Sequence, residues 1–114
     1  MKRPVESNQR KMRMIAFIAN AAGTSLSGPG SLEVSMTDTG TGVKTIELDK
    51  AFGASTQYVV LVTTATADTV AQVAITDANT FVISTFDSTD GTTAKDAICH
   101  VLVIGSDVAE KYES

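Results

Sequence analysis

The 114-residue chain has no tryptophan, only six other aromatic residues, two prolines, one histidine and one cysteine. A single cysteine excludes a disulfide within the chain and any metal site built from several thiolates. No apolar run approaches the roughly 18 residues of a membrane-spanning helix. The scarcity of aromatic side chains argues against an exposed platform on which sugars would stack. The composition therefore disfavours a disulfide-stapled protein, a thiolate metal site, a membrane-spanning helix and an aromatic sugar-binding surface.

Threonine and serine are abundant instead, with sixteen and ten residues, in a chain that is 43% hydrophobic. Threonine is β-branched and suits the half-exposed surface of a sheet. The hydrophobic fraction is that of a folded chain rather than a disordered one. The length is enough for one compact domain and not for two.

Short apolar or alternating segments recur about every ten residues, with turn-forming residues between them. This spacing is typical of an all-β sandwich or barrel. The sequence therefore predicts an all-β fold, a single antiparallel β-sandwich, jelly-roll-like, of about seven short strands. The predicted strands are 12–19, 32–37, 43–49, 57–66, 70–76, 78–87 and 97–105.

Segment 32–37 alternates between apolar and polar residues, which predicts a half-buried strand with Leu32, Val34 and Met36 facing inward. In segment 78–87 the same pattern sets Phe81 and Ile83 on one face, with Val82, Ser84 and Phe86 on the other. Alternation of this kind is expected where one face of a sheet covers the core and the other meets water.

Segments 12–19, 57–66 and 97–105 are apolar on both faces. This pattern predicts strands buried on both sides, with 57–66 as a central strand, although 12–19 is also compatible with a short helix. Cys99 and His100 are neighbours in the last of these segments and must point to opposite faces of a strand. We expect an inert core cysteine, and a histidine that lies either in the core or at a subunit interface.

Charge is divided unevenly along the chain. Residues 1–13 contain five bases and one acid, whereas the other 101 residues contain four bases and twelve acids. The pattern predicts a basic N-terminal arm (1–11), the sandwich (12–106) and a polar C-terminal tail (107–114). The acidic body would repel phosphates, so docking on a partner protein or neighbouring subunit is favoured over nucleic acid. The residues expected to make this contact are Lys2, Arg3, Arg10, Lys11 and Arg13.

Asp38, Thr39 and Gly40 spell the active-site triplet of aspartic proteases. That chemistry needs two carboxylates that share a proton, so a chain with one triplet would have to act as a dimer. The residues before Asp38 are not bulky and apolar, and 54–90 lacks the glycine expected of a flap. Aspartate and glycine are also common turn formers. The triplet therefore predicts a hairpin turn, with a dimeric protease as a distant alternative.

Asp87, Asp90 and Asp96 surround Gly91 in a polar loop. Their spacing does not match an EF-hand, which needs acidic residues at alternate positions and a terminal glutamate. We expect a solvated turn, with a loop cation as the alternative. No catalytic, cofactor-binding or metal-ligating residue is assigned, and no cofactor is expected.

Four stretches together resemble small β-sandwich proteins of tailed-bacteriophage virions: "TGTGVKTIELDKAF", "YVVLVTT", "TFVISTFDSTDG" and "CHVLVIGSD". The resemblance covers about residues 12–106 and includes head decoration (cement) proteins and tail-fibre or collar domains. It implies a non-enzymatic virion protein that assembles as a homotrimer and binds and stabilises the capsid shell, through the major capsid protein or another virion protein. Host attachment as a tail, fibre or collar component is the alternative, and no membrane is implied.

Overall fold

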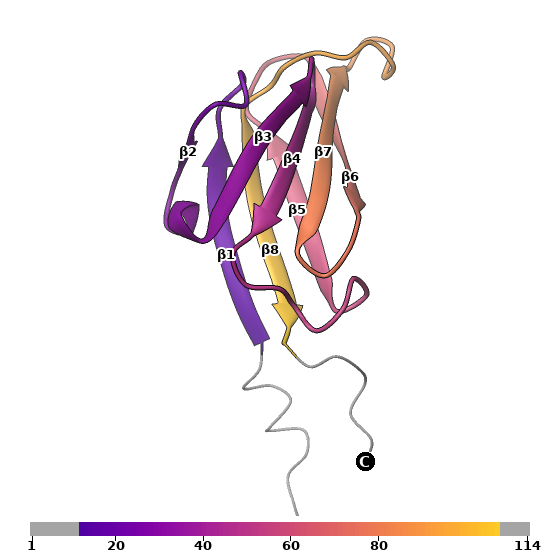
Figure 1. Ribbon diagram of the computed structural model, residues 1–114. Helices are drawn as coiled ribbons and strands as arrows, with labels where there is room; N and C mark the ends of the chain where they lie inside the picture. Colours follow the sequence, from indigo (N-terminus) through magenta and orange to yellow (C-terminus); the bar gives the residue numbers. More distant parts are fainter. Residues whose placement is uncertain (1–11, 108–114) are drawn as a thin grey trace, which may run out of the picture.

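The computed structural model describes residues 12–107, which form two antiparallel sheets packed face to face (Figure 1). The predicted all-β antiparallel sandwich is confirmed. The strands are β1 (Met12–Ala19), β2 (Leu26–Ser27), β3 (Val34–Gly40), β4 (Val43–Leu48), β5 (Tyr58–Thr64), β6 (Thr69–Ile75), β7 (Thr80–Asp87) and β8 (Cys99–Ser106). One sheet has the strand order β2-β1-β8-β5 and the other β3-β4-β7-β6.

The core lies between the two sheets and is filled by every second residue of the central strands. Phe81 and Ile83 of β7 and Ile46 of β4 are completely buried, and Phe17 of β1 faces them from the other sheet. The alternation predicted for 78–87 is therefore confirmed. Burying a side chain of this size contributes roughly 1.5–3 kcal/mol, so these residues dominate the stability of the fold.

The prediction for Leu32 is wrong. Leu32 lies in a short 3-10 helix, η1 (Ser31–Glu33), and its side chain is 92% exposed. The backbone N–H of Glu33 donates to the carbonyl of Gly30 (3.0 Å), so the chain is still turning where a strand was expected. The strand begins only at Val34, because the preceding glycine-rich loop folds back toward β1 and adds the unpredicted strand β2.

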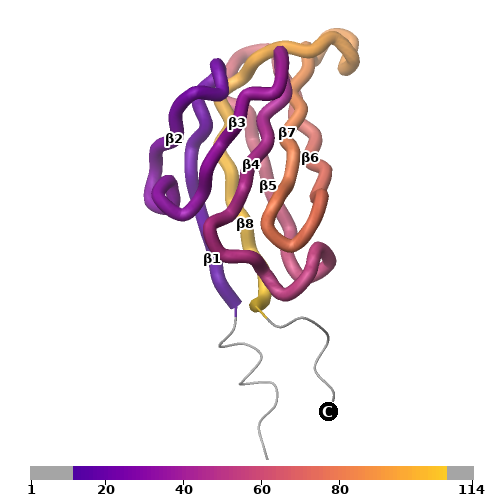
Figure 2. Tube along the Cα trace, viewed as in Figure 1, coloured from indigo at the N-terminus to yellow at the C-terminus, as the bar shows by residue number. Residues whose placement is uncertain are grey.

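The three segments that are apolar on both sides form β1, β5 and β8, which lie side by side in one sheet (Figure 2). Their inner faces are buried, but their outer faces are not: Met14 is 67% and Leu61 58% exposed. Strand β5 is at the edge of the sheet, with β8 in the centre. The predictions of two-sided burial and of a central 57–66 strand are therefore wrong for the single chain. A two-layer sandwich gives each sheet only one buried face, and the described residues supply no third layer.

Aromatic rings close one end of the core. Phe52 stacks on Tyr58 with 4.8 Å between the ring centroids, and the Arg13 guanidinium lies 4.1 Å above the Phe52 ring. Arg13 also forms an ion pair with Asp107 (2.9 Å). The Tyr58 hydroxyl donates to the carbonyl oxygen of Asp77 at 2.8 Å. These contacts join the start of β1, the end of β8 and the loop before β5.

We expect the protein to lose stability between pH 10 and pH 12. Burial, together with the nearby charge of Asp77, raises the pKa of Tyr58 from 10.0 to about 12. A raised pKa means that this stabilisation is complete below pH 10 and is lost as the pH rises to 12. The loss should be about 1–2 kcal/mol, because the hydroxyl is only part-buried. Urea unfolding at pH 9 and pH 11.5 would measure it, and a parent-like pH dependence in Tyr58→Phe would contradict the assignment.

Candidate interaction surface

The outer side of the β2-β1-β8-β5 sheet presents a continuous apolar surface, which we call the apolar face. Side chains alternate along a strand, so one residue in two from each strand points away from the core. The register aligns these side chains in rungs across β1, β8 and β5. The rungs are Met14–Ile104–Val59, Ala16–Leu102–Leu61 and Ile18–His100–Thr63, with Met12 at the end of β1.

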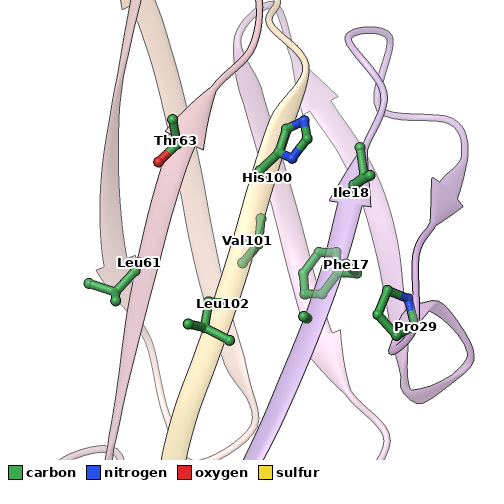
Figure 3. A pocket seen from close by; sticks show the side chains of 9 residues that line it. Phe17, Ile18, Pro29, Leu61, Thr63, His100, Val101 and Leu102 are labelled. Atoms are coloured by element: carbon green, nitrogen blue, oxygen red, sulfur yellow. The ribbon is translucent and has the colours of Figure 1, made fainter.

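The apolar face is not flat. Its middle rung begins with the small Ala16 on β1 and ends with the protruding Leu61 on β5. A groove of about 460 Å³ lies over this rung. Figure 3 shows Leu61 and Pro29 on opposite sides of the groove, with Leu102 between them. A second hollow of about 210 Å³ adjoins it over Ala16 and extends toward Met14. The face therefore has a ridge at Leu61 on β5, and a groove over β8 and β1 between Leu61 and Pro29.

Pro29 reaches the groove because its loop lies directly on strand β1. The backbone N–H of Gly30 donates to the carbonyl of Ala16 at 2.6 Å. A side chain at Gly30 would come within 2.7 Å of Ile15 and 2.8 Å of the Ala16 oxygen, so only glycine permits this approach. The "SGPG" sequence thus positions the proline at the side of the groove.

The opposite side of the sandwich has a different character. On the β3-β4-β7-β6 sheet the matching rungs contain Thr37–Thr45–Val82, and Ser35 beside Glu47. Such a mixed, mostly polar surface is normal for a sheet that faces water. None of the rung residues of the apolar face is an aspartate, glutamate, lysine or arginine. The apolar character is therefore a property of one sheet rather than of the protein as a whole.

His100 lies on the apolar face and is exposed, so the core alternative predicted for it is wrong and the interface alternative stays a prediction. Cys99 points the other way and is completely buried, as expected for a core cysteine. Burial raises the pKa of its thiol, and the nearby Lys44 opposes this effect in part. Lys44 itself is buried, with Nζ donating to the carbonyl of Ala97 at 3.1 Å.

Of the five basic residues predicted to bind a partner, only Arg13 lies within the described residues. Its guanidinium donates to Asp107 and to the carbonyls of Lys50 and Ala51, and its side chain is 17% exposed. Arg13 is thus engaged inside the sandwich. The other four, Lys2, Arg3, Arg10 and Lys11, lie outside the described residues.

Asp38 lies where the hairpin prediction placed it, at the end of β3. Its carboxylate is exposed and accepts a hydrogen bond from the N–H of Gly40 at 3.1 Å. The chain then turns at Gly42, whose φ of 72° is in the left-handed region, and continues as β4. The predicted hairpin turn is confirmed. The protease alternative gains no support from this position, because the Asp38 carboxylate is exposed near the end of β3 and is not held among apolar side chains.

The loop after β7 is held by its own hydrogen bonds. Hydrogen bonds from the side chain and N–H of Thr93 and from the N–H of Thr92 lower the pKa of Asp90 to about 2. Thr89 lowers the pKa of Asp87 in the same way. Asp96 instead accepts from the N–H of Gly42 at 2.6 Å, which ties the loop to the β3–β4 turn. Within residues 12–107, no three acidic, histidine or cysteine side chains lie together as a metal would need.

The part of the chain that the structure describes contains no helix long and apolar enough to cross a membrane. Comparison of the sequence with protein-family models and with curated proteins finds no match, and comparison with solved structures finds none either.

Proposed function

We propose that this chain is a non-enzymatic structural subunit, and that its setting is a tailed-bacteriophage virion, where it decorates and stabilises the capsid shell. The observation that carries the structural role is the apolar face. The virion setting is supported by the resemblance of the β-strand segments alone. Shell decoration is the leading role within this resemblance, and a tail, fibre or collar component is the alternative.

An apolar face of this kind favours a protein partner over a small ligand. It spans about 20 Å across β5, β8, β1 and the Pro29 loop beside β1, and about 25 Å along β1, or about 500 Å². Contiguous exposed apolar patches near the upper end of the usual size range mark interaction sites. The groove is shallow and shares its floor with the surrounding sheet, and its polar groups are few: Thr63 and His100. A broad apolar surface with only shallow relief is suited to packing against another protein.

The contact with the shell is assigned to the basic N-terminal arm, and in particular to Lys2, Arg3, Arg10 and Lys11. An arm with four bases can contact an acidic shell surface without using the apolar face. The apolar face is then free for contacts between decoration subunits. The resemblance implies three copies in the assembly.

The location of the chain on virus particles tests the proposal. Virus particles assembled from a genome that encodes it should carry gold label on the head shell. Label confined to the tail would select the fibre or collar alternative, and particles without the chain would contradict the virion proposal. Replacing all four arm bases with glutamine should weaken rebinding to stripped shells at least tenfold at low salt, whereas Lys50→Gln should not. Equal binding by both variants would remove the arm from the shell contact.

A further inference from the structure

We infer that a second copy of this chain covers the apolar face, in a symmetric pair whose two-fold axis runs parallel to β8. The inference rests on the proposed structural role but names the partner, and it differs from the three-copy assembly that the resemblance implies. The observation that supports this pairing is the middle rung of the sheet, where Ala16 lies under the groove and Leu61 forms a ridge.

The apolar face is self-complementary about this axis. Strands β1 and β5 lie on either side of β8, at equal strand spacings. A two-fold rotation about an axis above β8 and parallel to it places β5 of one copy over β1 of the other. Leu61 then enters the partner groove over Ala16, and the partner Leu61 does the same in return. Leu102 meets its own copy near the axis. In an isologous contact each such fit is made twice.

Alternative arrangements of two copies fit less well. A two-fold axis perpendicular to the strands would place β5 over β5, so that Leu61 would meet Leu61 and both grooves would stay empty. Sheets that pack face to face lie about 10 Å apart, with their strands rotated by about 30° because of their twist. The middle rung is central on the face, so this rotation leaves its contacts in register.

The overlap of the two faces forms a small interface. About this axis β5, β8 and β1 of one copy lie over those of the other on about 15 Å by 25 Å, so the pair buries roughly 750 Å² in projection, and more as accessible surface because side chains roughen both faces. The rung residues include no aspartate, glutamate, lysine or arginine, and Glu33, which lines the adjoining hollow at the border of the face, is exposed. The flexible Met14 and Met12 lie at one end and can adapt to the partner's relief.

The pair also suits the proposed attachment. An axis parallel to β8 leaves the two copies pointing the same way along their strands. Both copies then present Met12, where the basic arm joins, at the same end of the pair. Two arms at one end can contact one surface together, which raises the effective strength of attachment.

Light scattering on the purified full chain would measure the pairing. We expect twice the chain mass for the parent, and a single-chain mass for Leu61→Asp at the same concentration, with at least a 100-fold rise in the dissociation constant. The matched control is Val70→Asp, which adds the same charge at an exposed apolar residue on the outer side of the edge strand β6. The control should remain a pair. A monomeric or trimeric parent, or equal effects of both substitutions, would overturn the inference.

Cross-linking would test the register. Leu102→Cys should link to its own copy through a short bismaleimide, whereas Leu61→Cys should link only when mixed with Ala16→Cys chains. Self-linking of Leu61→Cys would overturn the axis that we assign. The buried Cys99 leaves the parent as an unreactive control. The two proposals fail in different ways. A monomer that still labels virion heads would refute the pair and keep the proposed function. A pair that is absent from virions would keep the pair and refute the virion setting. A monomer that binds lipid vesicles would show that a lipid surface, and not a second copy, covers the apolar face.

Discussion

Gly105→Ala is expected to lower the free energy of unfolding by about 3 kcal/mol, although it adds a single methyl group. Gly105 lies on β8 directly between Arg13 and Tyr58 in the neighbouring strands. A Cβ at this position would overlap the Cβ of Tyr58 and come within 2.7 Å of the Gln57 carbonyl oxygen and 2.8 Å of the Phe52 ring. Backbone and Cβ atoms cannot move aside by a change of rotamer. The stacked pair of rings would have to shift, and with it the end of the core.

The direction of the stability change distinguishes a crowded glycine site from an open one. In a strand with free space, alanine in place of glycine would stabilise by roughly 0.5–1 kcal/mol, because it restricts the unfolded chain. Urea unfolding of the two proteins separates these outcomes. Gly91→Ala is the control, since nothing lies within 4 Å of its added Cβ and its φ of 70° carries the only penalty, about 1 kcal/mol. A Gly105→Ala protein as stable as its parent would show that the rings do not depend on this glycine.

Lys44→Ala is expected to cost about 3 kcal/mol, an unusual loss for a lysine. Its side chain is 1% exposed and crosses the core from β4 to the segment before β8, where Nζ donates to the Ala97 carbonyl at 3.1 Å. Truncation removes three buried methylene groups, worth about 0.8 kcal/mol each, and takes a donor from a buried carbonyl, at about 1 kcal/mol. The same change at Lys50, whose side chain is 72% exposed, should alter stability by less than about 0.5 kcal/mol.

Lys44→Met separates packing from the polar contact. Methionine restores most of the volume without the amine, so we expect it to recover more than half of the loss measured for Lys44→Ala. Equal losses in the alanine and methionine variants would assign the whole effect to the hydrogen bond to Ala97. A loss below about 1 kcal/mol in Lys44→Ala would contradict the buried role of this side chain. Thermal and urea unfolding give the required comparison.

Lys44 also shows what sequence patterns can and cannot indicate. It lies two and four residues before Ile46 and Leu48, so the alternation that predicts the inner face of 43–49 includes it. A lysine is rarely buried, and the same pattern is compatible with a charged residue at the end of a strand. Only the structure shows that the last strand brings a carbonyl within reach of the amine.

The sequence indicated the strands of the candidate interaction surface, but it predicted that both of their faces would be buried. Segments apolar on both sides predicted strands with both faces covered, and three such segments were found. The tertiary structure places all three in one sheet and gives that sheet a single covered face. The pattern was therefore correct about the apolar character of the outer face, and the error was to take an apolar face for a buried one.

Local patterns in this sequence determined the all-β class, most strand positions, the hairpin at Asp38 and, except for Leu32, the inward residues of the alternating strands. These depend on alternation and turn chemistry, which act between near neighbours in the chain. The partnership of β1 with β8 and β5, the edge position of β5 and the groove beside Pro29 were decided only by the tertiary structure. Pairing between strands up to about ninety residues apart depends on how two sheets share one core, and no local pattern encodes that choice.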